Sequence, residues 1–482
     1  MPGAAKDLVL ALDQGTTGST VLALDRSLKV VGRGYATFAQ HFPEPGWVEH
    51  EPEEIWASVR QALAQALEGL DPARLAALGI TNQRETTFAL DADTFAPLHR
   101  AIVWQDRRTT ELCAAMKDQE PAIRAATGLP LDPYFSATKL RWLKDHLAGR
   151  RLAFATVDTF VIHRLSGAFV TDPSNASRTQ LFDLAKGAWS PDLIRRFGVE
   201  DIRLPEIVPN TGICARVRGV PGLPDGLPIA GIAGDQQAAL FGQGCFDAGQ
   251  AKVTYGTGSF VLLNSGERIP NSRHGLLGTV AWEMEGRRCF ALEGGAFVAG
   301  ALVQWLRDGL GLIKQAAESE TLARSVSDNG GVTVVPALAG LGAPHWRPEA
   351  RGAILGITRG TTAAHVARAA LEGIAHSQAD ILQAMAEDTG SPLKELRVDG
   401  GASANDLLMQ MQADLLGIPL HRPSLLETTA LGAAMLAGLG VGLWTLDELR
   451  RAYPLDRTFA PQGEAEAIRA SRTRWKEAVA KA

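Results

Sequence analysis

The stretch LVLALDQGTTGST, Leu8–Thr20, decides the fold of this chain. It opens with the apolar run Leu8–Leu12, and an unbroken apolar run of this kind is typical of a strand that is buried on both faces. The Gly/Thr segment 13–18 predicts a tight turn. Residues 19–25 then predict a second strand that runs back beside the first.

Outward from this hairpin, the pattern predicts a layered α/β domain. Strands are expected over 28–35 and 75–80. Between them, apolar residues recur at four-residue spacing over 53–67, which indicates an amphipathic helix.

The same unit returns in the second half of the chain. Residues 251–255 predict a strand, 256–259 a Gly/Thr turn, and 260–263 the returning strand. We therefore expect two α/β domains that share one topology. The segment 244–249 just before the second hairpin is not rich in proline or serine, so a short hinge is expected rather than a long tether. The predicted domains are residues 1–246 and 247–482.

Composition excludes several classes of function. The 482 residues carry a net charge of −5 without a Lys/Arg run, which argues against nucleic-acid binding. The four cysteines are far apart in the sequence, so neither a zinc site nor a disulfide framework is predicted, and a reducing compartment is expected. The N-terminus lacks the layout of a signal peptide, and a cytoplasmic location is expected. The uncharged stretch 428–446 is interrupted by glycines, which favours a buried helix and turn over membrane insertion.

The Gly/Thr turns carry the first chemical signal. A tight turn between strands can gather backbone N–H groups around phosphate oxygens. Asp13, at the end of a buried strand, would favour a divalent cation such as Mg²⁺. A plain hairpin turn is the alternative for one such segment, but the second copy at 256–259 favours two phosphate-binding hairpins. The glycine-rich patterns of P-loop and dinucleotide-binding proteins are absent.

The second signal is Asp235, which follows an apolar strand at the start of a predicted helix. A carboxylate there is stabilised by free backbone N–H groups and the helix dipole. The functional interpretation is a base or a hydroxyl-binding group, and the structural alternative is an ordinary helix cap.

A third signal is the polar run 81–87, in which Arg84 and Glu85 could hydrogen-bond a polyhydroxy ligand. A solvated turn explains the same pattern equally well. Trp104 and Tyr134 lie in aromatic–polar clusters of the kind that wall a small polar pocket, although core packing is the alternative.

In their order along the chain, these segments resemble the glycerol kinase branch of the FGGY carbohydrate kinase family. The strings that carry the resemblance span Leu8 to Leu443 and include LALDQGTTGST, ITNQRETT, VWQDRRT, YFSATKLRW, IAGDQQAALFGQ, TYGTGSF, LGAPHW and LRVDGGASANDLLMQ. The resemblance implies two ribonuclease-H-like domains of the actin/hexokinase type with a nucleotide cleft between them. It implies ATP-dependent phosphorylation of glycerol to sn-glycerol 3-phosphate, with Mg²⁺ and a homodimeric or homotetrameric assembly.

The resemblance also implies roles for individual residues. Asp235 matches the general base, and Asp13 matches the Mg²⁺-associated carboxylate. The glycerol-binding positions are Arg84, Glu85, Trp104, Tyr134, Asp235, Gln236 and Phe260. The nucleotide-binding positions are Thr16, Thr17, Gly18, Thr257, Gly300, Gln304, Gly401 and Asn405.

The chain departs from the family pattern in its first hairpin and in a regulatory loop. Many members have Arg where this chain has Thr20, which puts one cationic contact to the nucleotide in doubt. The loop 218–226 lacks the basic residue that binds fructose 1,6-bisphosphate, and no histidine occurs between His163 and His274 for phosphocarrier control. Both controls are expected to be absent. Two rival interpretations stay open: another FGGY sugar kinase, and a nucleotide-switched interaction protein on the same core.

Overall fold

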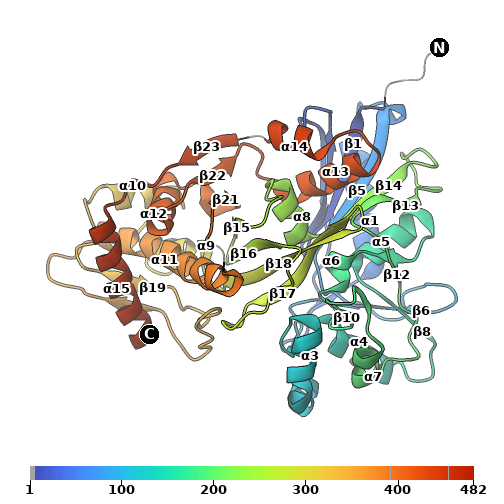
Figure 1. Cartoon of the computed structure of the whole chain (residues 1–482), viewed down its shortest axis with the longest axis horizontal. Helices are drawn as coiled ribbons and strands as arrows, with labels where there is room; N and C mark the ends of the chain where they lie inside the picture. Colours follow the sequence, from blue (N-terminus) through green and yellow to red (C-terminus); the bar gives the residue numbers. More distant parts are fainter. Residues whose placement is uncertain (1–5, 391, 454) are drawn as a thin grey trace.

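The computed structural model describes residues 6–390, 392–453 and 455–482. Two mixed sheets organise the chain, one in each half, and they lie side by side with helices around them (Figure 1).

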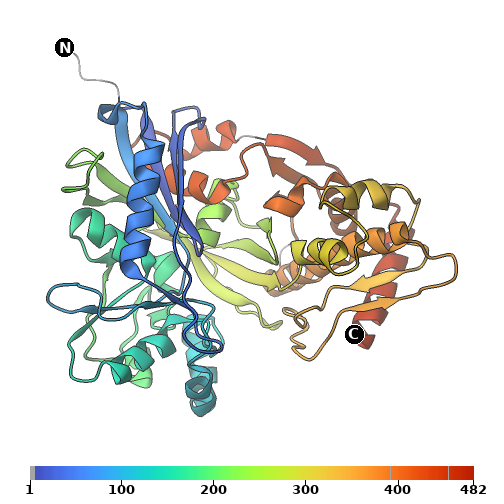
Figure 2. The ribbon, with the colours of Figure 1, turned by 180° about the vertical axis from the view of Figure 1, so that it is seen from behind.

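The first sheet is built outward from the hairpin at the N-terminus. β1 pairs antiparallel with β2 and parallel with β5, and β5 pairs parallel with β14. The order across the sheet is β13 (Thr211–Arg216), β14 (Pro228–Gly234), β5 (Leu75–Asn82), β1 (Leu8–Gln14), β2 (Gly18–Leu24) and β3 (Val30–Thr37). The predicted amphipathic helix is α1 (Pro52–Ala66), which lies against this sheet (Figure 2). Its buried apolar residues belong to the core under the sheet.

The second sheet repeats this pairing. β15 pairs antiparallel with β16 and parallel with β21, as β1 does with β2 and β5. Its order is β17 (Leu277–Met284), β18 (Arg287–Ala296), β16 (Ser259–Gly266), β15 (Gln250–Tyr255), β21 (Glu395–Asp399), β22 (Leu420–Pro423) and β23 (Leu455–Phe459). The repeated hairpin thus starts the same sheet topology twice. The proposed boundary at residues 246 and 247 falls between α8 (Asp235–Gly242) and β15.

The other described elements connect and cover the two sheets. The helices are α2 (Thr110–Ala115), α3 (Glu120–Thr127), α4 (Ser136–His146), α5 (Val157–Ser166), α6 (Pro173–Ala176), α7 (Pro191–Phe197), α9 (Gly300–Asp308), α10 (Glu318–Arg324), α11 (Ala363–Thr389), α12 (Asp406–Leu416), α14 (Leu446–Ala452) and α15 (Ala465–Lys481), with short 3₁₀ turns at η1 (Pro72–Arg74), η2 (Lys117–Gln119) and η3 (Gly401–Ala404). The minor strands are β4 (Glu49–His50), β6 (Phe88–Asp91), β7 (Ala101–Ile102), β8 (Leu152–Ala155), β9 (Val170–Thr171), β10 (Phe182–Asp183), β11 (Ala188–Trp189), β12 (Glu206–Ile207), β19 (Thr333–Val335) and β20 (Ala353–Leu355).

The uncharged segment forms α13 (Thr428–Gly440), which packs against the sheet of the other half (Figure 1). The contact requires glycine on the strands, since a Cβ at Gly79 would lie 2.0 Å from the carbonyl oxygen of Ala433. Gly432 allows α13 to pass equally close to the backbone of Ala238 in α8. The predicted buried helix is therefore confirmed, and within the described ranges no helix has the length and apolarity to span a bilayer.

Candidate active site

The parallel strands of the first sheet bring three predicted site segments to one edge. In the ladder, Asp13 pairs with Thr81 on the neighbouring strand, and Gly234 pairs with Asn82. The segment that contains Arg84 and the helix that begins at Asp235 therefore leave the sheet side by side. Carboxyl ends of parallel strands are the usual place for ligands in sheets of this type.

The polar run 81–87 is buried throughout, so the solvated-turn interpretation was wrong. Glu85 takes a left-handed backbone conformation with φ of 61°, which a residue other than glycine adopts at some energetic cost. Gly234 makes room for its neighbour, because a Cβ there would lie 2.6 Å from Cδ of Arg84. The local backbone is thus shaped around the Arg84 side chain.

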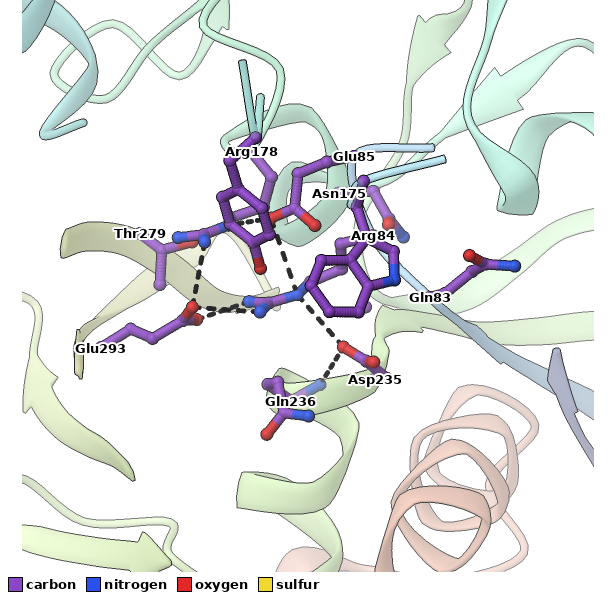
Figure 3. A network of polar contacts seen from close by, with 12 residues as sticks. Gln83, Arg84, Glu85, Asn175, Arg178, Asp235, Gln236, Thr279 and Glu293 are labelled. Carbon is purple, nitrogen blue, oxygen red and sulfur yellow. Dashed lines mark hydrogen bonds and ion pairs between the residues drawn. The ribbon is translucent and has the colours of Figure 1, made fainter. Parts of the chain in front are cut away.

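Arg84 lies at the centre of a buried network of charges (Figure 3). Its Nη1 is 2.5 Å and its Nη2 3.1 Å from the carboxylate oxygens of Glu293. Its Nε is 3.1 Å from Oδ1 of Asp235. The Arg84 guanidinium therefore faces the Asp235 carboxylate directly. The Arg84 side chain is only 2% exposed.

Arg178 and Glu293, two residues without a predicted role, complete the network. Nε of Arg178 donates to Glu85 over 2.6 Å, and its Nη2 donates to Glu293 over 2.9 Å. Burial by itself would raise the pKa of Glu293, but Arg178 and Arg84 hold this pKa down at about 2. The sequence does carry one indication of a role for Glu293, because it is the one acidic residue in the otherwise apolar run 289–298. A charged residue in such a run is expected to be buried, and a buried charge requires a partner.

Glu293 lies on β18 of the second sheet, whereas both arginines and Glu85 belong to the first half. The ionised network therefore crosses between the halves. Breaking any of its pairs would leave a buried charge uncompensated.

Three carboxylates of the site have a raised pKa. Burial raises the pKa of Glu85, and the charges of Arg84 and Arg178 oppose that rise. Burial raises the pKa of Asp235, and the charge of Arg84 and the backbone N–H of Gln236 oppose that rise. Burial, together with the charge of Asp235, raises the pKa of Asp13 to about 7. Within the described ranges, the Asp13 carboxylate has no hydrogen bond or ion pair, and no group of three or more metal-binding side chains occurs. Among the described residues, the Asp13 carboxylate is therefore not part of a preformed group of metal ligands.

Two predicted aromatic residues wall the same region. The rings of Trp104 and Tyr134 meet edge to face, with centroids 5.7 Å apart. The buried ammonium of Lys139 donates to three successive carbonyls, including that of Tyr134, and so holds this loop. Phe260, the third predicted aromatic residue, lies on β16 of the second sheet. Across the described part of the chain, no ring contact joins Phe260 to Trp104 or Tyr134.

The first hairpin closes through a hydrogen bond from the backbone N–H of Gly15 to the carbonyl of Gly18. Thr16 accepts two hydrogen bonds. Its backbone carbonyl accepts one from the side chain of Gln40, and its hydroxyl oxygen accepts one from the indole N–H of Trp104. Thr17 is exposed at the tip of the turn. The hairpin is thus anchored on one side and open at its tip.

The second hairpin brings three of the predicted nucleotide positions together. The backbone N–H of Gly300 donates to the carbonyl of Gly256, and that of Ala299 donates to Thr257. The turn that leads to Gly401 packs on the end of β15, since a Cβ at Gly400 would lie 2.5 Å from the carbonyl oxygen of Tyr255.

The other two nucleotide positions lie on helices beside this turn. Asn405 caps α12 by accepting from the backbone N–H of Leu408 over 2.9 Å. Gln304 follows Gly300 by about one turn of α9, and within the described residues its side chain has no hydrogen bond.

Comparison with known proteins agrees with this arrangement. Residues 8–242 match the N-terminal domain model of the FGGY family of carbohydrate kinases, and residues 251–441 match the C-terminal domain model. The chain is 54% identical to a glycerol kinase of Myxococcus xanthus over 98% of this chain and 99% of that protein. It is similar to the crystal structure of a Plasmodium falciparum glycerol kinase with ADP, with a TM-score of 0.93, 33% identity, and coverage of 99% and 98%. A gluconate kinase structure from Lactobacillus acidophilus shares the fold with a TM-score of 0.89 at 21% identity, covering 98% and 97%.

Proposed function

The chain belongs to the FGGY family of carbohydrate kinases, and we propose that it transfers the γ-phosphoryl group of ATP to glycerol, forming sn-glycerol 3-phosphate. Its identity to a glycerol kinase is 54%, whereas its identity to a gluconate kinase of the same fold is 21%. This difference favours glycerol over gluconate as the acceptor.

One observation carries the proposal. The carboxylate of Asp235 is 3.1 Å from the Arg84 guanidinium, and at 30% exposure it is open to a ligand. Asp235 follows β14, and the first hairpin follows β1. In the first sheet, only β5 lies between these two strands. An acceptor hydroxyl at Asp235 would therefore lie close to a phosphate held at that hairpin.

The mechanism follows from these positions. Asp235 accepts the proton of the attacking hydroxyl, and Arg84 and Glu85 hydrogen-bond the other hydroxyls of the polyol. Backbone N–H groups of the two hairpins hold the phosphates. Phosphoryl transfer depends mainly on such positioning and on neutralisation of charge.

The residues present fit a divalent cation at Asp13. Its carboxylate has no partner among the described residues and has a pKa of about 7, and it would supply an oxygen ligand of the kind that Mg²⁺ prefers together with phosphate oxygens. When bound there, Mg²⁺ would supply neutralisation of the phosphate charge. Asp13 would hold it, and we propose no other protein ligand.

Closure of the two halves is part of the proposal. The expected glycerol positions Trp104 and Tyr134 lie in the first half and Phe260 in the second, without a ring contact between them. A kinase must keep water away from the phosphoryl group, and closure of domains serves this purpose. Small-angle scattering should report a more compact particle with glycerol and nucleotide, and an unchanged curve would count against closure.

A coupled assay of ADP release tests the function. We expect ADP formation with ATP and Mg²⁺ to depend on glycerol, and xylulose, ribulose and gluconate to be poor substitutes. Faster turnover with one of those sugars would identify the chain as a different sugar kinase of the family. Hydrolysis that no polyol affects would favour a nucleotide-switched protein.

A further inference from the structure

A lysine without an expected role is buried where the two halves meet. Lys252 lies on β15 of the second sheet, and its side chain is inaccessible to solvent. Its Nζ donates to Oε1 of Gln236 and to Oγ1 of Thr254, the latter over 2.9 Å. Because Gln236 belongs to α8 of the first half, this hydrogen bond joins a proposed polyol-binding residue to the strand that leads into the second hairpin.

Nearby carboxylates favour the charged form of Lys252. Burial lowers the pKa of this lysine, while the charges of Asp399, Asp235 and Glu293 oppose that shift. A buried ammonium needs hydrogen-bond acceptors, and Nζ of Lys252 has two, Oε1 of Gln236 and Oγ1 of Thr254. Lys252 is therefore a hydrogen-bond donor held beside Gln236.

The ammonium determines which way the Gln236 amide faces. The oxygen and nitrogen of a glutamine amide are distinguished by their hydrogen-bond partners. A lysine ammonium can only donate, so the atom that faces it must be the amide oxygen. The NH₂ group of Gln236 then faces away, and among the described residues none accepts a hydrogen bond from it.

We propose that Lys252 is a positioning and specificity-determining residue that commits Gln236 to be a hydrogen-bond donor in the polyol pocket. This inference rests on the proposed function. Ionised Asp235 and Glu85 can only accept hydrogen bonds, and Arg84 can only donate. With Gln236 held as a donor, the pocket offers two accepting and two donating side chains. That set matches neighbouring hydroxyl groups, which give their protons to the carboxylates and receive donors at their lone pairs.

Gln236→Glu tests the direction of the amide without changing Lys252. The substitution keeps an oxygen for the ammonium and replaces only the NH₂ group that faces the pocket. We expect the KM for glycerol to rise about ten- to a hundredfold, because the hydroxyl oxygen loses its donor. The Kd for ADP, measured by calorimetry, should stay unchanged, which separates this loss from a general effect of the added charge. An unchanged KM for glycerol in Gln236→Glu would overturn the proposal.

A double-mutant cycle tests the role of Lys252 itself. Lys252→Met and Gln236→Ala should each raise the KM for glycerol, and the double variant should be no worse than Gln236→Ala alone, since both remove one interaction. Additive losses would mean that Lys252 acts independently of Gln236. If Lys252→Met does not fold, the result with Gln236→Glu decides. Stabilisation of each variant by glycerol without ATP gives a readout other than turnover, and glycerol-dependent turnover of the unaltered protein tests the proposed function separately.

Discussion

The indole Nε1–H of Trp104 donates a hydrogen bond to the hydroxyl oxygen of Thr16 over 3.0 Å. The first residue belongs to the proposed polyol wall and the second to the proposed phosphate hairpin. Because the indole occupies a lone pair of the Thr16 oxygen, the hydroxyl proton is free to point at a phosphate. The two proposed binding sites are therefore linked through one hydrogen bond.

Trp104→Phe keeps a smaller aromatic ring against the polyol and removes the N–H donor. We expect the KM for ATP to rise about two- to tenfold, as for the loss of one hydrogen bond, with a smaller change in the KM for glycerol. Steady-state kinetics measure both constants. Thr16→Ala should make the effect of Trp104→Phe disappear, whereas equal effects in both backgrounds would contradict the link.

Asp235→Asn removes the proposed base and changes the side chain by one atom. Turnover should fall about 10²- to 10⁴-fold, the usual contribution of general base catalysis. Calorimetric binding of ADP should be retained. Because burial raises the pKa of Asp235, the base is lost by protonation as pH falls. The acid limb of kcat/KM should therefore lie above the ordinary range for a carboxyl group, and nearly full turnover of the variant would exclude the role.

Asp13 should make stability depend on pH and on Mg²⁺. Its pKa is about 7 in the folded protein against an ordinary value of 3.8, so ionisation is disfavoured by folding. The neutral carboxyl group therefore contributes to the free energy of unfolding in full below pH 3.8. This contribution is lost as pH rises towards 7. Without metal, Asp13→Asn should therefore gain thermal stability over the unaltered protein between pH 5 and pH 8.

The same variant tests the cation site. Mg²⁺ should raise the melting temperature of the unaltered protein at pH 8 and leave Asp13→Asn unaffected, as measured by scanning calorimetry. Thr20, which lies directly opposite Asp13 in the strand pair, offers a second variant. Thr20→Arg places a cation beside the carboxylate and should remove the pH dependence. Equal stabilisation of all three proteins by Mg²⁺ would rule out Asp13 as its ligand.

Glu293→Gln should destabilise the protein because it leaves two buried guanidinium groups short of negative charge. Removing one partner of a buried ion pair costs about 3–5 kcal/mol, which denaturant unfolding can resolve. Glu283→Gln is the matched control on the neighbouring strand, since Glu283 is 20% exposed and, among the described residues, forms an ion pair only with Arg288. Its cost should stay below about 1 kcal/mol. Similar losses for the two variants would refute a special role for the network.

Gly79→Ala tests the packing of α13 on the first sheet. The added Cβ would overlap the carbonyl oxygen of Ala433, so the helix must shift. Overpacking of this kind costs about 1–3 kcal/mol in unfolding free energy. Gly360→Ala is the control, because a Cβ there would meet nothing closer than 3.8 Å. An unchanged stability of Gly79→Ala would show that this contact is not tight in solution.

Local patterns were sufficient for much of the fold. The apolar run before each Gly/Thr turn predicted the hairpins that start both sheets, and four-residue spacing predicted the helix now seen as α1. Asp235 could be singled out because it follows an apolar strand at the start of a predicted helix, although an ordinary helix cap would give the same pattern. These features depend on residues close together in the chain, so the sequence alone carries them.

Only the tertiary structure decided which charges meet. Arg84 and Glu293 are 209 residues apart, and no periodicity relates them. The sequence of the polar run 81–87 was equally consistent with a solvated turn. The tertiary structure buries this run, and there Glu85 pairs with Arg178 and Arg84 pairs with Glu293. The packing of α13 on the opposite sheet was equally hidden, because a helix that is apolar on all sides does not indicate which sheet will cover it.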